Sequence, residues 1–316
     1  MAEAQLYGGI EAGGTKFVCV VGMGPADIID ETRIETSQPG ATLEQVIRFF
    51  KPYCREGKIS AIGLGSFGPL DLVRDSPTYG FITSTPKPGW QNADLLGPLR
   101  SALDVSVELD TDVNAAALGE WTWGATTSLA SSLYMTIGTG IGGAYLQEAT
   151  PIQGLHHSEM GHIFIPRDSV RDPFPGCCPF HGACFEGLAS GPAIKLRFGR
   201  AAEELPDDHP FWELEAEYIA SALASIILIL APSRIVLGGG IMHREFMFPQ
   251  IRRLVLNLLG NYLPDSAELE HVNSYIVPPG LGSHSGSYGA IALAMRSRRG
   301  QAAKAYTRSD AVGRSG

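Results

Sequence analysis

Three clusters of glycine, each beside an apolar segment typical of a β-strand, constrain the fold of this chain more than any other feature. They lie at residues 8–16, 136–143 and 238–240. Glycine reaches positive φ angles and lets a phosphate approach main-chain N–H groups without interference from a Cβ atom. Each cluster alone therefore predicts either a tight hairpin turn or a phosphate-binding loop.

The number of these clusters and their neighbouring residues favour phosphate binding. Glycine accounts for 38 of the 316 residues, which is about 12% where ~7% is usual, without the Gly-X-Y period of collagen. Thr15, Thr139 and Lys16 add side-chain donors. The Walker A pattern does not occur, and the predicted turns join strand to strand, whereas a Rossmann fingerprint joins strand to helix. We therefore expect phosphate-binding hairpin turns.

Strands and helices alternate along the sequence, which predicts an α/β fold and not a β-sandwich. Strands are expected at residues 6–10, 17–22, 28–36, 60–68, 105–110, 132–137, 141–146 and 234–238. Helices are expected at residues 41–57, 92–103, 113–121, 211–230 and 286–296. A chain of this length forms about two domains.

The charge of the chain argues against two classes of partner. Its 33 acidic and 24 basic residues give a formal net charge of −9, which disfavours binding to nucleic acid or to an anionic membrane.

The longest apolar run, Ile226–Ala231, is too short to span a bilayer. The first ten residues lack the basic start and apolar run of a signal peptide, so we expect a cytoplasmic protein.

A loop-rich segment in the middle of the chain contains four of the eight histidines and three of the five cysteines. Cys178, His181 and Cys184 follow the spacing Cys-x2-His-x2-Cys, and His162 lies 22 residues before Cys184. Two thiolates and two imidazoles form a closed tetrahedral set that is typical of structural zinc, because a catalytic zinc keeps one position open. The alternative is a group of buried free thiols beside a surface histidine. Cys177 is a spare thiol next to the predicted ligand.

Another group of polar residues lies where a predicted strand ends and a helix begins. Asp110, Asp112 and Asn114 occupy alternate positions along this junction. The Asp112 side chain could accept a hydrogen bond from an N–H group two or three residues further on and act as a helix N-cap. It could instead be a general base that takes a proton from a hydroxyl group attacking a phosphate. Spacing alone favours the N-cap.

The segments IEAGGTKF, ITSTPKPGW, DTDVNAAALGEW and CPFHGAC resemble the ROK family of sugar kinases and repressors, in particular its zinc-binding, fructokinase-like branch. The resemblance covers nearly the whole chain. It implies a two-domain actin-like ATPase fold, of the ribonuclease H-like kind, with nucleotide and sugar between the domains. The expected parts are an N-terminal α/β domain at residues 1–121 completed by a helix at about 286–298, a larger α/β domain with the zinc-binding loop at 122–285, and a disordered tail at 299–316.

The same resemblance assigns roles to residues. Asp112 falls on the Asp of the family's Asp-x-Asn pattern, which is the catalytic base, and this reverses the preference for an N-cap. Thr111 departs from the Asn of many relatives, and Ser158 from the first Gly of the family's Gly-Glu-x-Gly-His; the Thr111 departure bears on which sugar fits. Without the family, Glu159 and Glu186 would read as exposed loop acids. The expected sugar-binding residues are Gly68, Thr111, Asn114, Glu159, His162 and Glu186.

The resemblance also identifies the glycine clusters as two phosphate loops and an adenosine loop. The expected ATP-binding residues are Glu11, Gly13, Gly14, Thr15, Lys16, Gly138, Thr139, Gly140, Gly239 and Gly240. Glu11 replaces the Asp that is more usual in the first loop, and it still offers a carboxylate towards Mg²⁺ or a metal-bound water.

The expected activity is an ATP-dependent fructokinase with Mg²⁺ and structural Zn²⁺, acting as a homodimer on a hexose and ATP. The alternatives are a kinase for another hexose such as mannose or glucose, a sugar-responsive repressor, and a non-catalytic sugar-binding protein. The first glycine cluster begins at Gly8, which leaves no room for an N-terminal helix-turn-helix, and the net charge disfavours DNA. Asp112 together with complete phosphate loops disfavours a non-catalytic protein.

Overall fold

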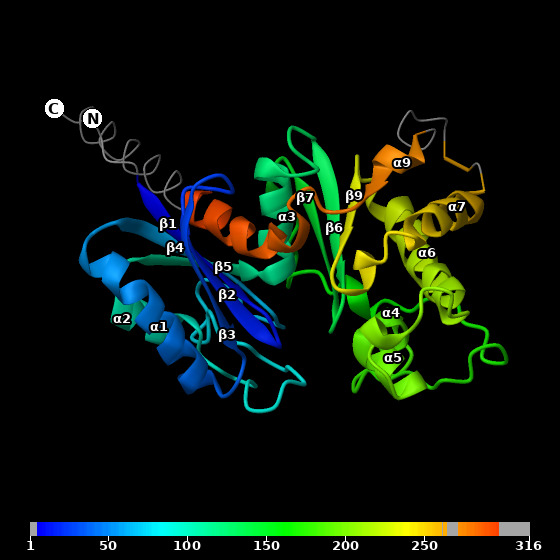
Figure 1. Ribbon diagram of the computed structural model, residues 1–316, viewed down its shortest axis with the longest axis horizontal. Helices are drawn as coiled ribbons and strands as arrows, with labels where there is room; N and C mark the ends of the chain where they lie inside the picture. Colours follow the sequence, from blue (N-terminus) through cyan, green and yellow to red (C-terminus); the bar gives the residue numbers. More distant parts are fainter. Residues whose placement is uncertain (1–4, 261, 264–270, 297–316) are drawn as a thin grey trace. The chain divides into compact units, whose positions relative to one another are not determined.

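The structure, a computed structural model, describes residues 5–260, 262–263 and 271–296 and forms two compact units. Unit 1 comprises the chain up to Gly119 together with the part from His284 onward, and unit 2 comprises Glu120–Ser283. Each unit contains one five-stranded sheet (Figure 1). The predicted tail at 299–316 and the last two residues of the predicted closing helix lie outside the described residues.

The sheet of unit 1 has the strand order β3-β2-β1-β4-β5. Its first three strands form an antiparallel meander, and β4 and β5 run parallel to β1. The strands are β1 (Leu6–Ala12), β2 (Lys16–Gly22), β3 (Ile28–Glu35), β4 (Ile59–Ser66) and β5 (Ser106–Thr111). Helices α1 (Pro39–Arg55) and α2 (Leu96–Leu103) cover one face, and the helix at residues 285–296 lies across the other (Figure 1).

Two glycines of the first cluster lie inside strand β1 and not in the turn that follows it. Because successive residues of a strand face opposite sides of the sheet, Gly8 faces α1 and Gly9 faces the helix at 285–296. A Cβ atom on Gly8 would come within 2.8 Å of Phe50, and one on Gly9 within 2.7 Å of the Ser287 carbonyl oxygen. These glycines therefore allow close packing of helices on both faces of the sheet.

Helix α2 starts later than the sequence pattern predicts. The helix was expected from residue 92, but the chain becomes helical only at Leu96. Asn92 has a positive φ of 59°, and the Asp94 carboxylate accepts a hydrogen bond from the Gly97 N–H at 2.8 Å. Side-chain capping by Asp94 thus replaces the first predicted turn.

The sheet of unit 2 repeats the strand order of unit 1. Strands β6, β7 and β8 form the antiparallel meander, β9 runs parallel to β6, and β10 runs parallel to β9, which gives the order β10-β9-β6-β7-β8. The strands are β6 (Ser131–Ile137), β7 (Ile141–Gln147), β8 (Thr150–Pro151), β9 (Ile235–Gly238) and β10 (Ile276–Val277). The helices are α3 (Asp112–Trp123), which begins in unit 1, and α4 (Phe185–Ala189), α5 (Gly191–Phe198), α6 (Phe211–Leu230), α7 (Met247–Leu259) and α9 (Val272–Tyr275).

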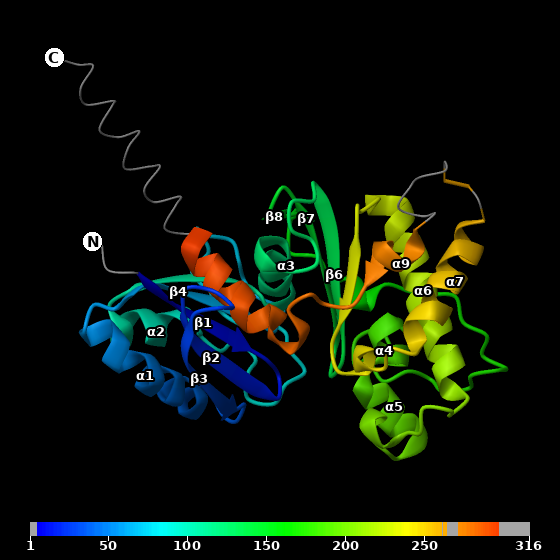
Figure 2. The same ribbon diagram turned by 45° about the horizontal axis from the view of Figure 1, so that its top comes forward.

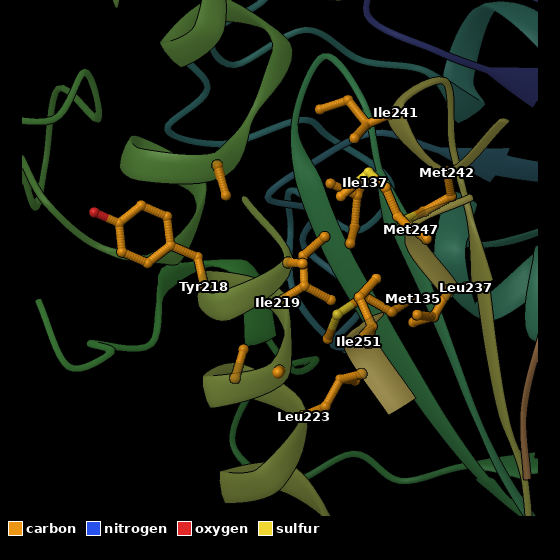
Figure 3. Packing of buried hydrophobic residues seen from close by; sticks show 14 of the residues in the cluster. Met135, Ile137, Tyr218, Ile219, Leu223, Leu237, Ile241, Met242, Met247 and Ile251 are labelled. Atoms are coloured by element: carbon orange, nitrogen blue, oxygen red, sulfur yellow. The ribbon is translucent and has the colours of Figure 1, made fainter. Parts of the chain in front are cut away.

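Helix α6 provides the core of unit 2. It spans the predicted residues, and α7 lies beside it (Figure 2). Ile219 and Leu223 of α6 pack towards Met135 and Ile137 of strand β6, and all four side chains are buried (Figure 3). Within the described residues, no helix combines the length and apolarity that crossing a membrane requires.

Candidate functional site

The first glycine turn is braced from strand β3. The Gly13 N–H donates to the Lys16 carbonyl oxygen at 3.0 Å across the turn. Thr36 donates from its hydroxyl to the Gly13 carbonyl oxygen at 2.7 Å and from its N–H to the Thr15 carbonyl oxygen at 3.0 Å. Thr15 and Lys16 are exposed. The turn is therefore held by its carbonyl groups, while its side-chain donors face solvent, as phosphate binding requires.

Three parallel strands of unit 1 end side by side. In the strand register Ala12 of β1 lies opposite Ser66 of β4, and Ser66 lies opposite Thr111 of β5. The residues that precede or follow these ends, Glu11, Gly68 and Asp112, therefore belong to one edge of the sheet. Ligands of open α/β sheets bind outside this carboxyl edge.

The electrostatics of this edge favour a cation. The pKa of Glu11 is raised to about 7, first because its carboxyl is buried and second because of the negative charge of Asp112, while Lys16 acts in the opposite direction. Two carboxylates within electrostatic reach of one another are the hard oxygen donors that Mg²⁺ prefers. Glu11 and Asp112 thus fit a divalent cation, with Lys16 placed to meet an anion.

The start of helix α3 is capped by Thr111. The Thr111 hydroxyl accepts a hydrogen bond from the Asn114 N–H at 3.1 Å. The Asp112 carboxylate accepts from the adjacent Val113 N–H at 2.8 Å. Asn114 is buried, and its side-chain amide donates to the Asp110 carboxylate at 2.6 Å. The junction is rigid, and Thr111 takes the capping position that spacing alone had assigned to Asp112.

The second glycine turn joins β6 to β7 in unit 2. The Gly138 N–H donates to the Gly140 carbonyl oxygen at 2.9 Å, and the Gly191 N–H donates to the Gly138 carbonyl oxygen at 2.7 Å. Thr139 at its tip is exposed. Strand β9 ends next to this turn, and a Cβ on Gly138 would lie 3.4 Å from the N atom of Gly240. Gly239 has a φ of +90°, which favours glycine. The second and third glycine clusters therefore lie together.

The four predicted zinc ligands converge. The ligand atoms of His162, Cys178, His181 and Cys184 all lie within 4.8 Å of one another. The Sγ atom of Cys178 is 3.7 Å from Nδ1 of His162 and 3.6 Å from Nδ1 of His181, and Cys184 Sγ is 3.6 Å from His162 Nδ1. Tetrahedral zinc with ordinary bond lengths separates sulfur and nitrogen ligands by about 3.5 Å. The residues fit zinc.

A tight turn sets the spacing of these ligands. Cys178 and Gly182 exchange backbone hydrogen bonds at 2.9 and 3.2 Å, and Gly182 has a φ of +58°. The turn brings His181 back towards Cys178, and Cys184 then becomes the N-cap of α4 by accepting from the Gly187 N–H at 3.4 Å. Cys177 is half-buried and is not one of the four converging residues.

Two acids of unit 2 have partners that the sequence did not indicate. Glu159 is exposed, and its carboxylate lies 3.4 Å from Nδ1 of His157, a side chain with only 6% of its surface exposed. Glu186 accepts a hydrogen bond from the Ile141 N–H at 2.8 Å. The sequence could not identify either partner. His157 is one of two adjacent histidines, and Ile141 contributes only a backbone N–H group.

Trp90, the last residue of the ITSTPKPGW segment, is fully buried. Its indole N–H donates to the Ser37 carbonyl oxygen at 2.8 Å, and its ring contacts Phe17 and Phe67. Trp90 therefore anchors this loop by packing.

Several known proteins resemble this chain in sequence or in structure. A fructokinase of Lactococcus lactis subsp. cremoris is 46% identical over 264 residues, which cover 83% of this chain and 89% of that protein. A fructokinase of Zymomonas mobilis subsp. mobilis is 42% identical over 298 residues, which cover 93% and 97%. The ROK hexokinase of Thermus thermophilus has a TM-score of 0.74 at 26% identity, over 93% of this chain and 99% of that one.

The structural match confirms the predicted fold class, a mixed α/β actin-like ATPase fold with two sheets. The model of the ROK family matches residues 7–297, nearly the whole chain, and on this ground the chain belongs to the ROK family.

Proposed function

We propose that this protein is an ATP-dependent fructokinase, which transfers the γ-phosphate of ATP to the 6-hydroxyl of D-fructose and yields ADP and D-fructose 6-phosphate. Two fructokinases at 46% and 42% identity over most of the chain support the substrate. The observation that carries the chemistry is the carboxyl edge of the unit 1 sheet, where Glu11 and Asp112 lie together and Thr111 caps helix α3.

Asp112 is the proposed general base. Because Thr111 satisfies the Asn114 N–H, this cap does not engage the Asp112 carboxylate. In the reaction Asp112 accepts the proton of the sugar 6-hydroxyl as its oxygen attacks the γ-phosphate. A carboxylate on the first residue of a capped helix keeps the fixed position that such a transfer needs.

The glycine turns are the proposed ATP site. The turn at Gly13–Lys16 and the turn at Gly138–Gly140 offer backbone N–H groups and the Thr15 and Thr139 hydroxyls to the phosphates, with Gly239 and Gly240 at the adenosine. Mg²⁺ supplies neutralisation of the phosphate charge when it is bound, and Glu11 is the residue proposed to hold it, directly or through water.

The proposed sugar contacts are the residues that the family resemblance implies. They are Gly68, Thr111, Asn114, Glu159, His162 and Glu186. Carboxylates such as Glu159 accept hydrogen bonds from sugar hydroxyls, which suits a polyol substrate. His162 contributes indirectly, because it is also a proposed zinc ligand three residues after Glu159.

Zinc is proposed as a structural ion that holds the loop between β8 and α4. Four protein ligands complete its tetrahedron, so no position remains for a substrate. We also propose that the protein acts in the cytoplasm, where thiols stay reduced and ATP is abundant, and that it forms a homodimer, as its resemblance to the family implies.

A direct comparison of sugars tests this function. Purified protein with ATP and Mg²⁺ should phosphorylate fructose with a higher kcat/KM than mannose or glucose, measured by ADP release. A preference for mannose or glucose would favour the kinase for another hexose. Fructose binding without ADP release would favour the sugar-responsive regulator.

A further inference from the structure

Glu186 connects the zinc-binding segment to the second glycine turn. It lies on α4, two residues after the ligand Cys184, and its Oε2 atom accepts the Ile141 N–H at 2.8 Å. Ile141 is the first residue of β7, immediately after the turn. A Cβ on Gly140 would lie 2.9 Å from the same oxygen. A side chain at residue 140 would therefore lie in tight contact with this carboxylate.

The segment that carries Glu186 contacts the turn a second time. The Gly191 N–H, at the start of α5, donates to the Gly138 carbonyl oxygen at 2.7 Å. The two contacts are five residues apart, because Glu186 is the second residue of the short helix α4, which follows the zinc ligand Cys184. The segment from Glu186 to Gly191 thus holds both ends of the turn. Gly191 binds the Gly138 carbonyl oxygen, and Glu186 binds the Ile141 N–H.

The other ligand-bearing segment holds the same strand. The Ser158 hydroxyl donates to the Gly143 carbonyl oxygen at 3.1 Å. Gly161, next to the ligand His162, packs so closely on the Ile141 carbonyl that no Cβ could be accommodated there. Two segments that carry zinc ligands, the one around His162 and the one around Cys184, therefore both contact strand β7 near its start.

We propose that Glu186 is a positioning residue that couples the sugar subsite and the zinc cluster to the second ATP phosphate loop. This inference rests on the proposed function, since it takes Gly138–Gly140 as a phosphate loop and Glu186 as a sugar contact. One carboxylate oxygen fixes the turn through Ile141, and the other accepts a sugar hydroxyl. Binding of the sugar and binding of the nucleotide then both depend on the Glu186 side chain, and the zinc cluster fixes the position of that side chain.

Two variants separate these roles. In Glu186→Gln the amide oxygen can still accept the Ile141 N–H, but an NH₂ group replaces the oxygen offered to the sugar. Glu186→Ala loses both contacts and leaves a buried N–H unpaired, which should cost about tenfold in affinity for the nucleotide. The dissociation constant of a non-hydrolysable ATP analogue is measured by calorimetry without sugar, and that of fructose separately.

The expected result is that Glu186→Gln binds the analogue as the wild type does but binds fructose weakly, whereas Glu186→Ala is weakened for both. Unchanged analogue affinity in Glu186→Ala, with fructose affinity lost, would show a sugar contact only and overturn the coupling. Zinc content and circular dichroism of both variants must match the wild type, because a lost fold would weaken all ligands alike.

Amide hydrogen exchange separates this inference from the proposed function. The peptide that contains Ile141 should exchange faster in Glu186→Ala than in the wild type, and Glu186→Gln should stay close to the wild type. Equal protection in all three proteins would overturn the contact itself. A wild-type protein that binds no ATP analogue and phosphorylates no hexose would contradict the proposed function, and with it the coupling, while the exchange data would still report on the contact.

Discussion

The Thr111 hydroxyl accepts a hydrogen bond from the Asn114 N–H at 3.1 Å, and so Thr111 caps helix α3. The neighbouring carboxylate of Asp112 accepts from the Val113 N–H at 2.8 Å, a bond between adjacent residues and not an N-cap bond. The Asn114 N–H, one of the donors that an Asp112 N-cap would accept, therefore has Thr111 as its partner. Thr111, one of the residues at which this chain departs from the family pattern, is thus also the residue that caps the helix.

Removal of this cap should lower stability. Thr111→Ala is expected to reduce the free energy of unfolding by about 1 kcal/mol, since the Asn114 N–H loses its acceptor. Thr111→Ser keeps the hydroxyl and is the matched control. Urea denaturation measures both. A serine variant as unstable as the alanine variant would show that the methyl group, and not the hydroxyl, stabilises this position.

The zinc assignment predicts about one zinc ion per chain by elemental analysis. Cys184→Ser should lose the metal and unfold at lower temperature, because four ligands cross-link the loop and the start of α4. The adjacent thiol gives a matched control, since Cys177→Ser should keep full zinc content. If Cys177→Ser lost the zinc and Cys184→Ser retained it, the ligand set would be wrong.

The raised pKa of Glu11 predicts a pH dependence of stability. With a folded-state pKa of about 7 and an unfolded-state value near 4.5, the folded protein binds more protons between these values. The contribution of Glu11 to stability therefore falls as the pH rises from about 5 to 8. The free energy of unfolding is measured by denaturation without nucleotide and Mg²⁺. Over this pH range it should fall for the wild type relative to Glu11→Gln. A constant difference between the two proteins would contradict the raised pKa.

The buried ring of His157 should orient the Glu159 carboxylate, 3.4 Å away. His157→Ala is expected to raise the KM for the hexose several-fold and to leave the KM for ATP nearly unchanged. The exposed neighbour gives the control, so His156→Ala should match the wild type in both constants. If both substitutions changed the hexose KM equally, the proposal that His157 orients Glu159 would be wrong.

The sequence predicted those features that depend on short spacing. Strand β2 follows from a short continuous apolar run and helix α6 from a long segment with an apolar face, and the four zinc ligands lie within 23 residues of one another. The turns at Gly13 and Gly138 were predicted for the same reason, since each joins two strands that are adjacent in sequence.

Features that depend on packing between distant segments could not be predicted. Gly8 and Gly9 were expected in a strand, but the sequence did not indicate that helices approach them from both faces of the sheet. The contact between Glu186 and Ile141 joins residues 45 positions apart through a backbone N–H, which every residue other than proline provides. The repeated strand order of the two units leaves no sequence repeat, because pairing depends on the alternation of side chains and not on their identity.

The most direct test of the account is the turnover of Asp112→Asn with fructose, ATP and Mg²⁺. Asparagine preserves the shape of the side chain and cannot act as a base, so kcat should fall by about 10²- to 10⁴-fold, while zinc content, unfolding free energy and affinity for an ATP analogue stay near those of the wild type. A variant that phosphorylates fructose at the wild-type rate would contradict the assignment of Asp112 as the general base.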